Sequence, residues 1–333
     1  MRSDRLFTTV DFHTAGIGMR LVTSGVPRLP GASIAEKRRH FQTHLDHIRT
    51  GLCLEPRGHR GMLIAVLVEP VTPGASLGLI FMYPGGYYVS CGEATIGAVT
   101  IATSTGLVPH ADGDTTVLVD TEAGPIETVA HRDGDRVRAV TIRWTPSYVL
   151  RTGETVKLRD QGELPLDIAV GAGNVFAIVD AHAAGLAIRP EATAEIARRG
   201  MAARAAINEQ LRVEHPDGTA APIENVIFHE PLDGQRVSPN ALVWGPGQVD
   251  AAPCGSGTCA RMALFHHRGE LAVGDTYTSR GLSGLTFTGR VARETGIGGR
   301  RAVMPEVTGT AFITGTGQVL FDPEDPLRAG LVL

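Results

Sequence analysis

The chain has 333 residues, of which 43% are hydrophobic and 20% are charged. That length exceeds one average domain, so we expect one large domain or two medium domains with a real hydrophobic core. A formal net charge of −4 and an aromatic content of 5% argue against the basic surfaces and base-stacking platforms of nucleic-acid-binding proteins. We therefore expect no nucleic acid partner.

The first thirteen residues, MRSDRLFTTVDFH, contain no apolar segment of the kind that signal peptides carry. The longest apolar runs, such as MLIAVLV at 62–68, are too short to cross a bilayer. Four cysteines without a secretion signal predict free thiols in a reducing compartment. We expect a cytoplasmic protein without a membrane partner.

Apolar runs at 10–25 and 61–71 predict strands. Between them Ser33 and Glu36 form a capping box that begins a helix, and apolar residues recur at helical spacing as far as Leu52. Three histidines lie beside the apolar stripe of this helix, namely His40, His44 and His47. Because charged residues surround them, we interpret them as a solvated face and expect no metal.

The rest of the chain is rich in strand-like segments, and helical segments are few. Strands are predicted at 78–83, 116–120, 126–130, 136–143, 174–180, 223–230 and 241–244, and short strands between 277 and 320. Helices are predicted at 94–104, 191–212 and 257–267. This order indicates an α+β fold built by internal duplication, with one helix after each of two similar Cys-Gly turns.

The two turns read SCGEATIG at 90–97 and PCGSGTCA at 253–260. In each, a threonine follows the cysteine at the same offset, Thr95 after Cys91 and Thr258 after Cys254. A helix N-terminus presents unpaired N–H groups and a partial positive charge, which stabilise a thiolate and can hold a carboxylate. Facing one substrate, one thiolate could remove an α-proton while the other thiol returns a proton to the opposite face. The pattern thus predicts inversion at an α-carbon.

Other readings of these residues stay open. Asp250 could accept a hydrogen bond from a substrate amine, or it could merely order the loop as an Asx turn. Cys53 and Cys259 are interpreted as core residues. A cysteine hydrolase would need an orienting histidine, and near the turns only His266 and His267 follow, at the far end of the second helix. A binding protein that has lost catalysis is the remaining alternative.

The chain contains only two lysines that could form a Schiff base, Lys37 and Lys157. We expect Lys37 on the exposed face of the capped helix and Lys157 in a polar stretch. Pyridoxal phosphate chemistry is therefore not predicted, and we expect no cofactor.

Several segments carry a family resemblance over essentially the whole chain. They are DFHTAG (11–16), LEPRGH (54–59), SCGEATIGA (90–98), GNVFAIVDA (173–181), VDAAPCGSGTCARMA (249–263), FTGRV (287–291) and MPEVTGTAFITG (304–315). With these motifs the chain resembles the proline racemase family, which includes proline racemases, hydroxyproline 2-epimerases and trans-3-hydroxyproline dehydratases.

The resemblance implies a diaminopimelate-epimerase-like fold of two pseudo-symmetric domains, each with a sheet wrapped around a central helix, and an active site in the interdomain cleft. We place the domains at 1–145, carrying Cys91, and 146–333, carrying Cys254, and the strands from about 305 are free to return to the first domain. The implied reaction is a cofactor-independent racemisation or epimerisation of proline or a hydroxyproline.

By the same match, Cys91 and Cys254 are the catalytic acid and base, and Asp250 contacts the ring nitrogen. The backbone of four residues would hold the substrate carboxylate, namely Gly92, Glu93, Gly255 and Ser256. A homodimer is left open.

Within the family, dehydratases typically carry threonine in the second turn, so two cysteines favour a racemase or epimerase over the alternative lyase. Three positions depart from the family pattern. Glu93 stands where histidine is usual, IGMR at 17–20 replaces a Glu-Pro segment, and Gly61 stands near the usual place of an aspartate. A non-standard substrate is therefore a second alternative.

Overall fold

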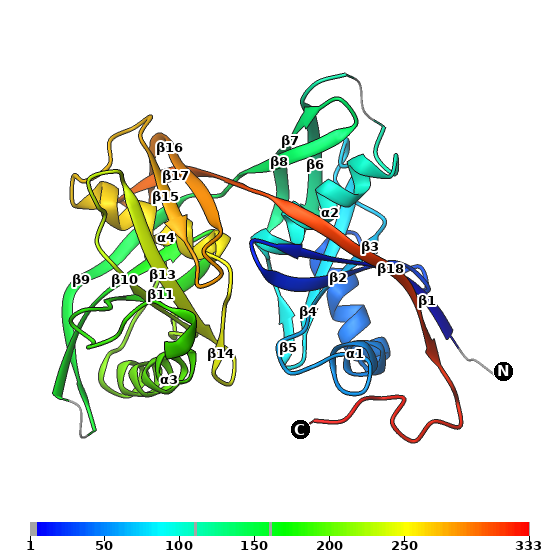
Figure 1. Ribbon diagram of the computed structural model, residues 1–333, viewed down its shortest axis with the longest axis horizontal. Helices are drawn as coiled ribbons and strands as arrows, with labels where there is room; N and C mark the ends of the chain where they lie inside the picture. Colours follow the sequence, from blue (N-terminus) through cyan, green and yellow to red (C-terminus); the bar gives the residue numbers. More distant parts are fainter. Residues whose placement is uncertain (1–4, 110–111, 160–161, 333) are drawn as a thin grey trace. The chain divides into compact units, whose positions relative to one another are not determined.

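The computed structural model describes residues 5–109, 112–159 and 162–332. The chain divides into two compact units (Figure 1). Unit 1 comprises Met1–Ile142 and Thr310–Leu333, and unit 2 comprises Arg143–Gly309. Among the described residues, no helix combines the length and the apolar character that a membrane span requires.

In its described residues, unit 1 is a mixed sheet with two helices. Its elements are β1 (Arg5–Thr14), β2 (Ile17–Ser24), α1 (Ile34–Cys53), β3 (Leu63–Val68), β4 (Leu77–Tyr83), β5 (Gly86–Tyr88), α2 (Gly92–Ser104), β6 (Thr115–Thr121), β7 (Gly124–Asp133), β8 (Arg136–Arg143) and β18 (Ala311–Phe321). Strand β1 pairs antiparallel with both β18 and β2, so the last strand of the chain completes the sheet of the first unit.

Unit 2 has the same kind of organisation. Its elements are β9 (Ser147–Leu158), β10 (Gly162–Gly171), β11 (Asn174–Asp180), the short helix η1 (Pro190–Ala192), α3 (Thr193–Gln210), β12 (Asn225–His229), β13 (Val237–Trp244), β14 (Gln248–Val249), α4 (Gly255–His267), β15 (Thr276–Arg280), β16 (Thr286–Ile297) and β17 (Arg300–Gly309). Strands β16 and β17 have 12 and 10 residues, so the expectation of only short strands in the C-terminal part was wrong. The glycines in this part lie partly within the strands rather than between them.

The order of strand pairings is the same in both units. In unit 1, β1–β2 is antiparallel, β2–β3 parallel, β3–β4 antiparallel, β4–β6 parallel and β6–β7 antiparallel. In unit 2, β10–β11, β11–β12, β12–β13, β13–β15 and β15–β16 repeat that series. The parallel steps need crossover connections, which α1 and α2 occupy in one unit and α3 and α4 in the other. The predicted α+β fold with internal duplication is confirmed.

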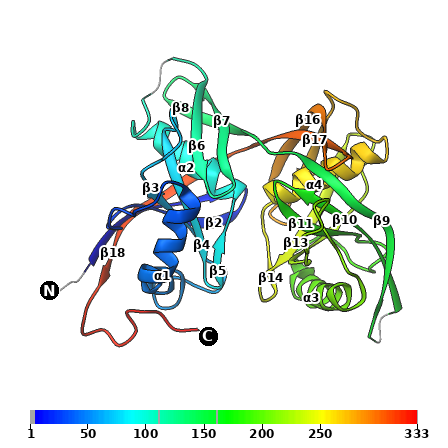
Figure 2. The same ribbon diagram turned by 180° about the vertical axis from the view of Figure 1, so that it is seen from behind.

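Each unit has a helix that is covered by strands. Helix α2 is buried from Gly92 to Thr103 and packs against β1, β2, β3, β7 and β18. Helix α4 packs against β9, β10, β11, β16 and β17, and Figure 2 shows it among these strands. A side chain at Gly97 would overlap the ring of Phe12, because a Cβ added there would lie 1.9 Å from that ring. The small residues of SCGEATIG thus allow α2 to pack closely against β1.

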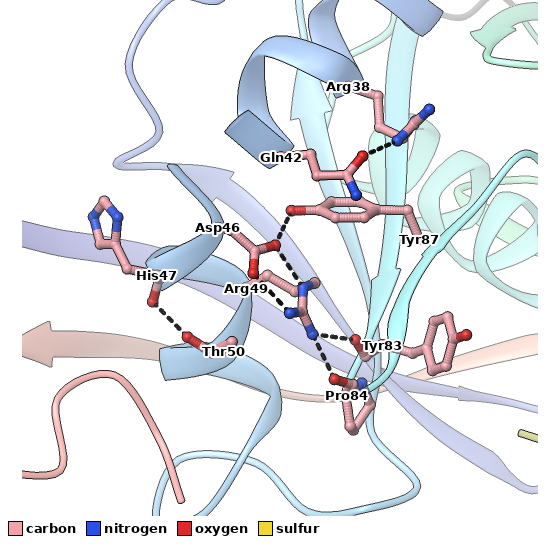
Figure 3. A network of polar contacts seen from close by, with 9 residues as sticks. All are labelled: Arg38, Gln42, Asp46, His47, Arg49, Thr50, Tyr83, Pro84 and Tyr87. Atoms are coloured by element: carbon pink, nitrogen blue, oxygen red, sulfur yellow. Dashed lines mark hydrogen bonds and ion pairs between the residues drawn. The ribbon is translucent and has the colours of Figure 1, made fainter. Parts of the chain in front are cut away.

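A polar network joins α1 to the hairpin of β4 and β5, from which the chain leads to the first Cys-Gly turn (Figure 3). The Arg49 guanidinium donates to both carboxylate oxygens of Asp46 and to the backbone carbonyls of Tyr83 and Pro84. The Tyr87 hydroxyl donates to Asp46 Oδ1 at 2.6 Å. The Arg49 hydrogen bond holds the pKa of Asp46 below its usual range. This network fixes the turn of the hairpin against the helix.

Candidate active site

Cys91 is the N-cap residue of α2, with an extended backbone conformation at φ −145° and ψ 112°. Its carbonyl accepts hydrogen bonds from the N–H and the hydroxyl of Thr95, at 3.0 and 2.8 Å. Its Sγ lies 3.8 Å from Oε2 of Glu93, in the first turn of the helix. A carboxylate beside a sulfur disfavours the thiolate and accepts the thiol proton. This half-site therefore favours a protonated cysteine.

Glu93 is only 6% exposed although its side chain is acidic. The hydroxyl of Thr14, which belongs to the DFHTAG segment of β1, donates to the Glu93 carbonyl at 2.9 Å. This bond ties the first turn of α2 to the first hairpin of the unit. The N-terminal motif thus supports the half-site of Cys91 through the helix backbone.

Cys254 is the N-cap residue of α4 and has φ 61° and ψ 114°. A non-glycine residue in such a conformation costs about 1–3 kcal/mol, and strain of this kind is concentrated at functional sites. Its Sγ accepts a hydrogen bond from the Gly257 N–H at 3.3 Å. A Cβ on Gly257 would lie 3.1 Å from that sulfur and 2.6 Å from Cδ1 of Ile227. The glycine therefore lets the sulfur approach the first-turn amide.

Arg261 lies two turns after Cys254 on α4 and is fully buried. It donates to the carbonyl and hydroxyl oxygens of Ser238 at 3.3 and 3.0 Å and to the hydroxyl of Ser279, and its guanidinium lies 5.6 Å from the ring centroid of Tyr277. Within the part of the chain that the structure describes, no carboxylate forms an ion pair with it.

Burial lowers the pKa of Arg261, whereas the acidic groups of Tyr277 and Cys254 act in the opposite direction. Arginine keeps its proton in proteins, so a positive charge is enclosed near the Cys254 sulfur. That charge and the Gly257 amide both favour a thiolate. The two half-sites are therefore electrostatically different. Cys91 has the acidic Glu93 beside it, whereas Cys254 lies near the buried Arg261 charge and also has a carboxylate oxygen of Asp250 within 4.8 Å of its sulfur.

Sequence reasoning missed Arg261. The signal was its place within GSGTCARMA, seven positions after Cys254, where a helix returns to nearly the same face. Nothing in the sequence predicted that this charged residue would be buried.

The other predicted site residues lie in the same two turns. Gly92 and Glu93 begin α2, and Gly255 and Ser256 begin α4, so their amides belong to first turns that lack acceptors within the helix. The Ser256 hydroxyl is 3.7 Å from the Cys254 sulfur. Asp250 is 4% exposed, and its Oδ1 accepts the Ala252 N–H at 2.8 Å, which is the Asx-turn arrangement.

The remaining cysteines and Lys37 are buried and have structural roles. Cys53 and Cys259 are fully buried, as expected of core residues, and burial raises the pKa of Cys53 to about 12. The expectation that Lys37 is exposed was wrong, because it is 4% exposed and its Nζ donates to the Glu69 carbonyl at 2.7 Å. Its long aliphatic stem packs against the unit while the ammonium reaches a backbone oxygen.

Comparisons with known proteins identify the family of the chain. The model of the family "Proline racemase" matches residues 9–332. The chain is 38% identical to a proline racemase of Clostridioides difficile, with 100% of both chains covered. It is 37% identical to a trans-3-hydroxy-L-proline dehydratase of Burkholderia cenocepacia (strain HI2424), again over 100% of both.

Among solved structures, the fold is similar to a hydroxyproline epimerase from Agrobacterium vitis with bound trans-4-hydroxy-L-proline. The TM-score is 0.91 and the identity 31%, with coverage of 100% of this chain and 97% of that one. The duplicated fold, the cysteine-capped central helices and the match across nearly every residue lead to one conclusion: this chain belongs to the proline racemase family.

Proposed function

We propose that the protein is a cofactor-independent amino-acid racemase or epimerase that inverts the α-carbon of proline or a hydroxyproline. The observation that carries the proposal is that each central helix begins at a cysteine, with the sulfur of Cys254 on a first-turn amide. Two thiols at helix N-termini supply what a two-base inversion needs. These are a proton acceptor, a proton donor and backbone amides for a carboxylate.

In this proposal the Arg261 charge and the first-turn amides set the starting protonation state. Cys254, near the buried Arg261 and the Gly257 amide, starts as the thiolate, and Cys91, beside Glu93, starts as the thiol. The Cys254 thiolate takes the α-proton, the electron pair delocalises into the substrate carboxylate, and the Cys91 thiol donates its proton to the opposite face. The turnover ends with Cys254 protonated and Cys91 ionised, so the two sulfurs titrate as one coupled system. Loss of the proton from Cys254 to solvent and return of a proton from solvent to Cys91 reset the enzyme.

The function is tested by incubating the protein with L-proline, trans-4-hydroxy-L-proline and trans-3-hydroxy-L-proline in D₂O. We expect deuterium at the α-carbon together with the inverted isomer for at least one substrate, without added cofactor. A cyclic imine that borohydride reduces, formed from the 3-hydroxy substrate, would instead indicate the dehydratase. The absence of exchange from all three substrates would contradict the proposal for proline-like compounds.

Glu93 is proposed to help select the substrate by accepting hydrogen bonds from a substrate ammonium or hydroxyl group. Glu93→Gln keeps the size and removes the charge, whereas Glu93→His introduces the residue usual at this position. We expect both variants to change the ratio of kcat/KM between proline and the hydroxyprolines by about tenfold, since hydrogen bonds to charged groups contribute about 1.5–3 kcal/mol.

The matched control for Glu93 is Glu195→Gln, which changes a first-turn glutamate on the exposed face of α3. Its substrate ratio should equal that of the unmodified protein. If Glu93→Gln and Glu93→His also leave this ratio of kcat/KM unchanged, the proposed substrate contact is refuted. Glu93 would then only interact with the partial positive charge of the helix N-terminus.

A further inference from the structure

A cavity of about 620 Å³ lies in unit 2 at the C-terminal end of α4, opposite the helix end that carries Cys254. Strands β10, β11 and β12 supply one wall, and the end of α4 with the residues after it supplies another. Its volume is in the range of sites that bind small molecules, about 300–1,000 Å³. Neither cysteine turn contributes to its lining.

The strand register places the polar residues of the wall on one face. Asp167 pairs with Ile178 across β10 and β11, and Asp180 pairs with His229 across β11 and β12. Paired residues and residues two positions apart project to the same side of a sheet. All four line the cavity, together with Phe265 of α4, whose ring contacts the His229 ring edge to face.

His229 is 4% exposed, and its Nδ1 lies 3.0 Å from the Glu230 carbonyl. A carbonyl can only accept, so Nδ1 carries the proton and Nε2 presents a lone pair. Among the described residues Nε2 has no hydrogen-bond partner. Burial, with a smaller effect of the Arg261 charge, lowers the pKa of His229 to about 3. The cavity therefore contains a buried neutral imidazole that can accept a hydrogen bond.

The charged groups of the lining leave an acidic excess. Arg268 donates to Asp167 Oδ2 at 2.6 Å, so these two residues neutralise each other. Asp180 Oδ1 accepts the backbone amides of His182 and Ala183 and lies 3.9 Å from Nδ1 of the exposed His182 ring, which leaves Oδ2. Glu270 forms no ion pair within the described ranges. Apolar surface lies beside them, contributed by Pro165, Leu166, Ile178, Pro231 and Phe265. The partial negative charge of the α4 C-terminus adds to the acidic side chains.

We propose that this cavity is a second binding site, which takes a small organic ammonium ion with an apolar body. The ammonium donates to the Asp180 carboxylate and to Nε2 of His229, and the apolar part packs against Ile178 and Phe265. The site is separate from the cysteine half-sites and does not depend on the racemase chemistry.

The test uses benzylamine, which is cationic at neutral pH, with benzyl alcohol and benzoate as neutral and anionic analogues. Affinities are measured by titration calorimetry on the full chain. The location is read from the ring ¹⁵N resonances of labelled histidine, in which Nε2 of His229 is assigned with the His229→Phe variant. We expect saturable benzylamine binding that shifts the His229 Nε2 resonance, weaker binding of benzyl alcohol and none of benzoate.

Asp180→Asn should weaken benzylamine binding by about tenfold or more, because it replaces a charged acceptor by a neutral one. The matched control is Asp217→Asn, an exposed aspartate that likewise orders a turn in unit 2 but lies outside the cavity, and it should bind as the unmodified protein does. His229→Phe keeps an aromatic ring and should also weaken binding, with folding checked by circular dichroism. Equal binding of amine and benzoate, an unmoved His229 resonance, or unchanged affinity in Asp180→Asn would each overturn the proposal.

Discussion

Replacing either half-site cysteine by alanine is expected to lower the rate of racemisation by about 10²–10⁴-fold, the contribution of one positioned acid or base. Cys254→Ala removes the proposed base, and Cys91→Ala removes the proposed acid. Each loss should fall mainly on kcat, because the first-turn amides proposed to hold the carboxylate remain. The measurement is the initial rate of inversion followed by polarimetry on the best substrate of the proline panel.

The chain supplies a matched control for each variant. Cys53→Ala removes a buried thiol from α1 in unit 1, and Cys259→Ala removes one from α4 in unit 2. Both should affect stability more than kcat, since a buried cysteine acts as a small hydrophobic residue. Full activity in both Cys91→Ala and Cys254→Ala would refute the two-thiol mechanism.

Arg261→Met is expected to make Cys254 a weaker nucleophile at neutral pH and to slow turnover. The buried guanidinium stabilises the thiolate, so its removal should raise the midpoint pH of Cys254 alkylation by on the order of one unit. The measurement is the pH dependence of iodoacetamide labelling in a Cys91→Ala background, quantified by mass spectrometry of the peptide that contains Cys254. Methionine fills a similar volume, and buried charges are often replaced by apolar residues without loss of stability.

Arg261→Lys separates charge from packing. It keeps the positive charge but loses the forked donors. The midpoint pH of Cys254 alkylation should therefore lie between that of Arg261→Met and that of the unmodified protein. Arg198→Met, on the exposed part of α3, is the matched control and should leave the midpoint unchanged. If Arg261→Met leaves the midpoint in place, Arg261 has a structural role only and the assignment of Cys254 as the resting thiolate is wrong.

Local sequence signals predicted the helices that matter for the site. Ser33 caps α1 as expected, its hydroxyl accepting the Glu36 N–H, while Glu36 reaches the N–H of Ala32 rather than that of Ser33. The helices after both Cys-Gly turns begin within two residues of the prediction. Caps and glycine turns are determined by neighbouring residues, which is why the sequence alone could predict them.

Long-range packing could not be predicted in this way. The burial of Lys37 and Arg261 depends on segments that are distant in the sequence. The acceptor of Lys37 is Glu69, directly after β3, and the acceptors of Arg261 lie on β13 and β15. In the sequence, Lys37 and Arg261 both stand at helical positions where a basic residue is usually exposed. The strain at Cys254 could not be predicted either, because no residue type in the turn indicates a positive φ at the cysteine.

The central claim is that two thiols serve opposite faces of one α-carbon, and single-cysteine variants test it most directly. Each variant is incubated with the L and the D enantiomer of the substrate in D₂O, and α-deuterium is measured by mass spectrometry. The remaining thiol can reach only the hydrogen on its own face, so Cys91→Ala and Cys254→Ala should exchange opposite enantiomers, without inversion. Exchange of the same enantiomer by both variants, or inversion by either one at the unmodified rate, would contradict the account.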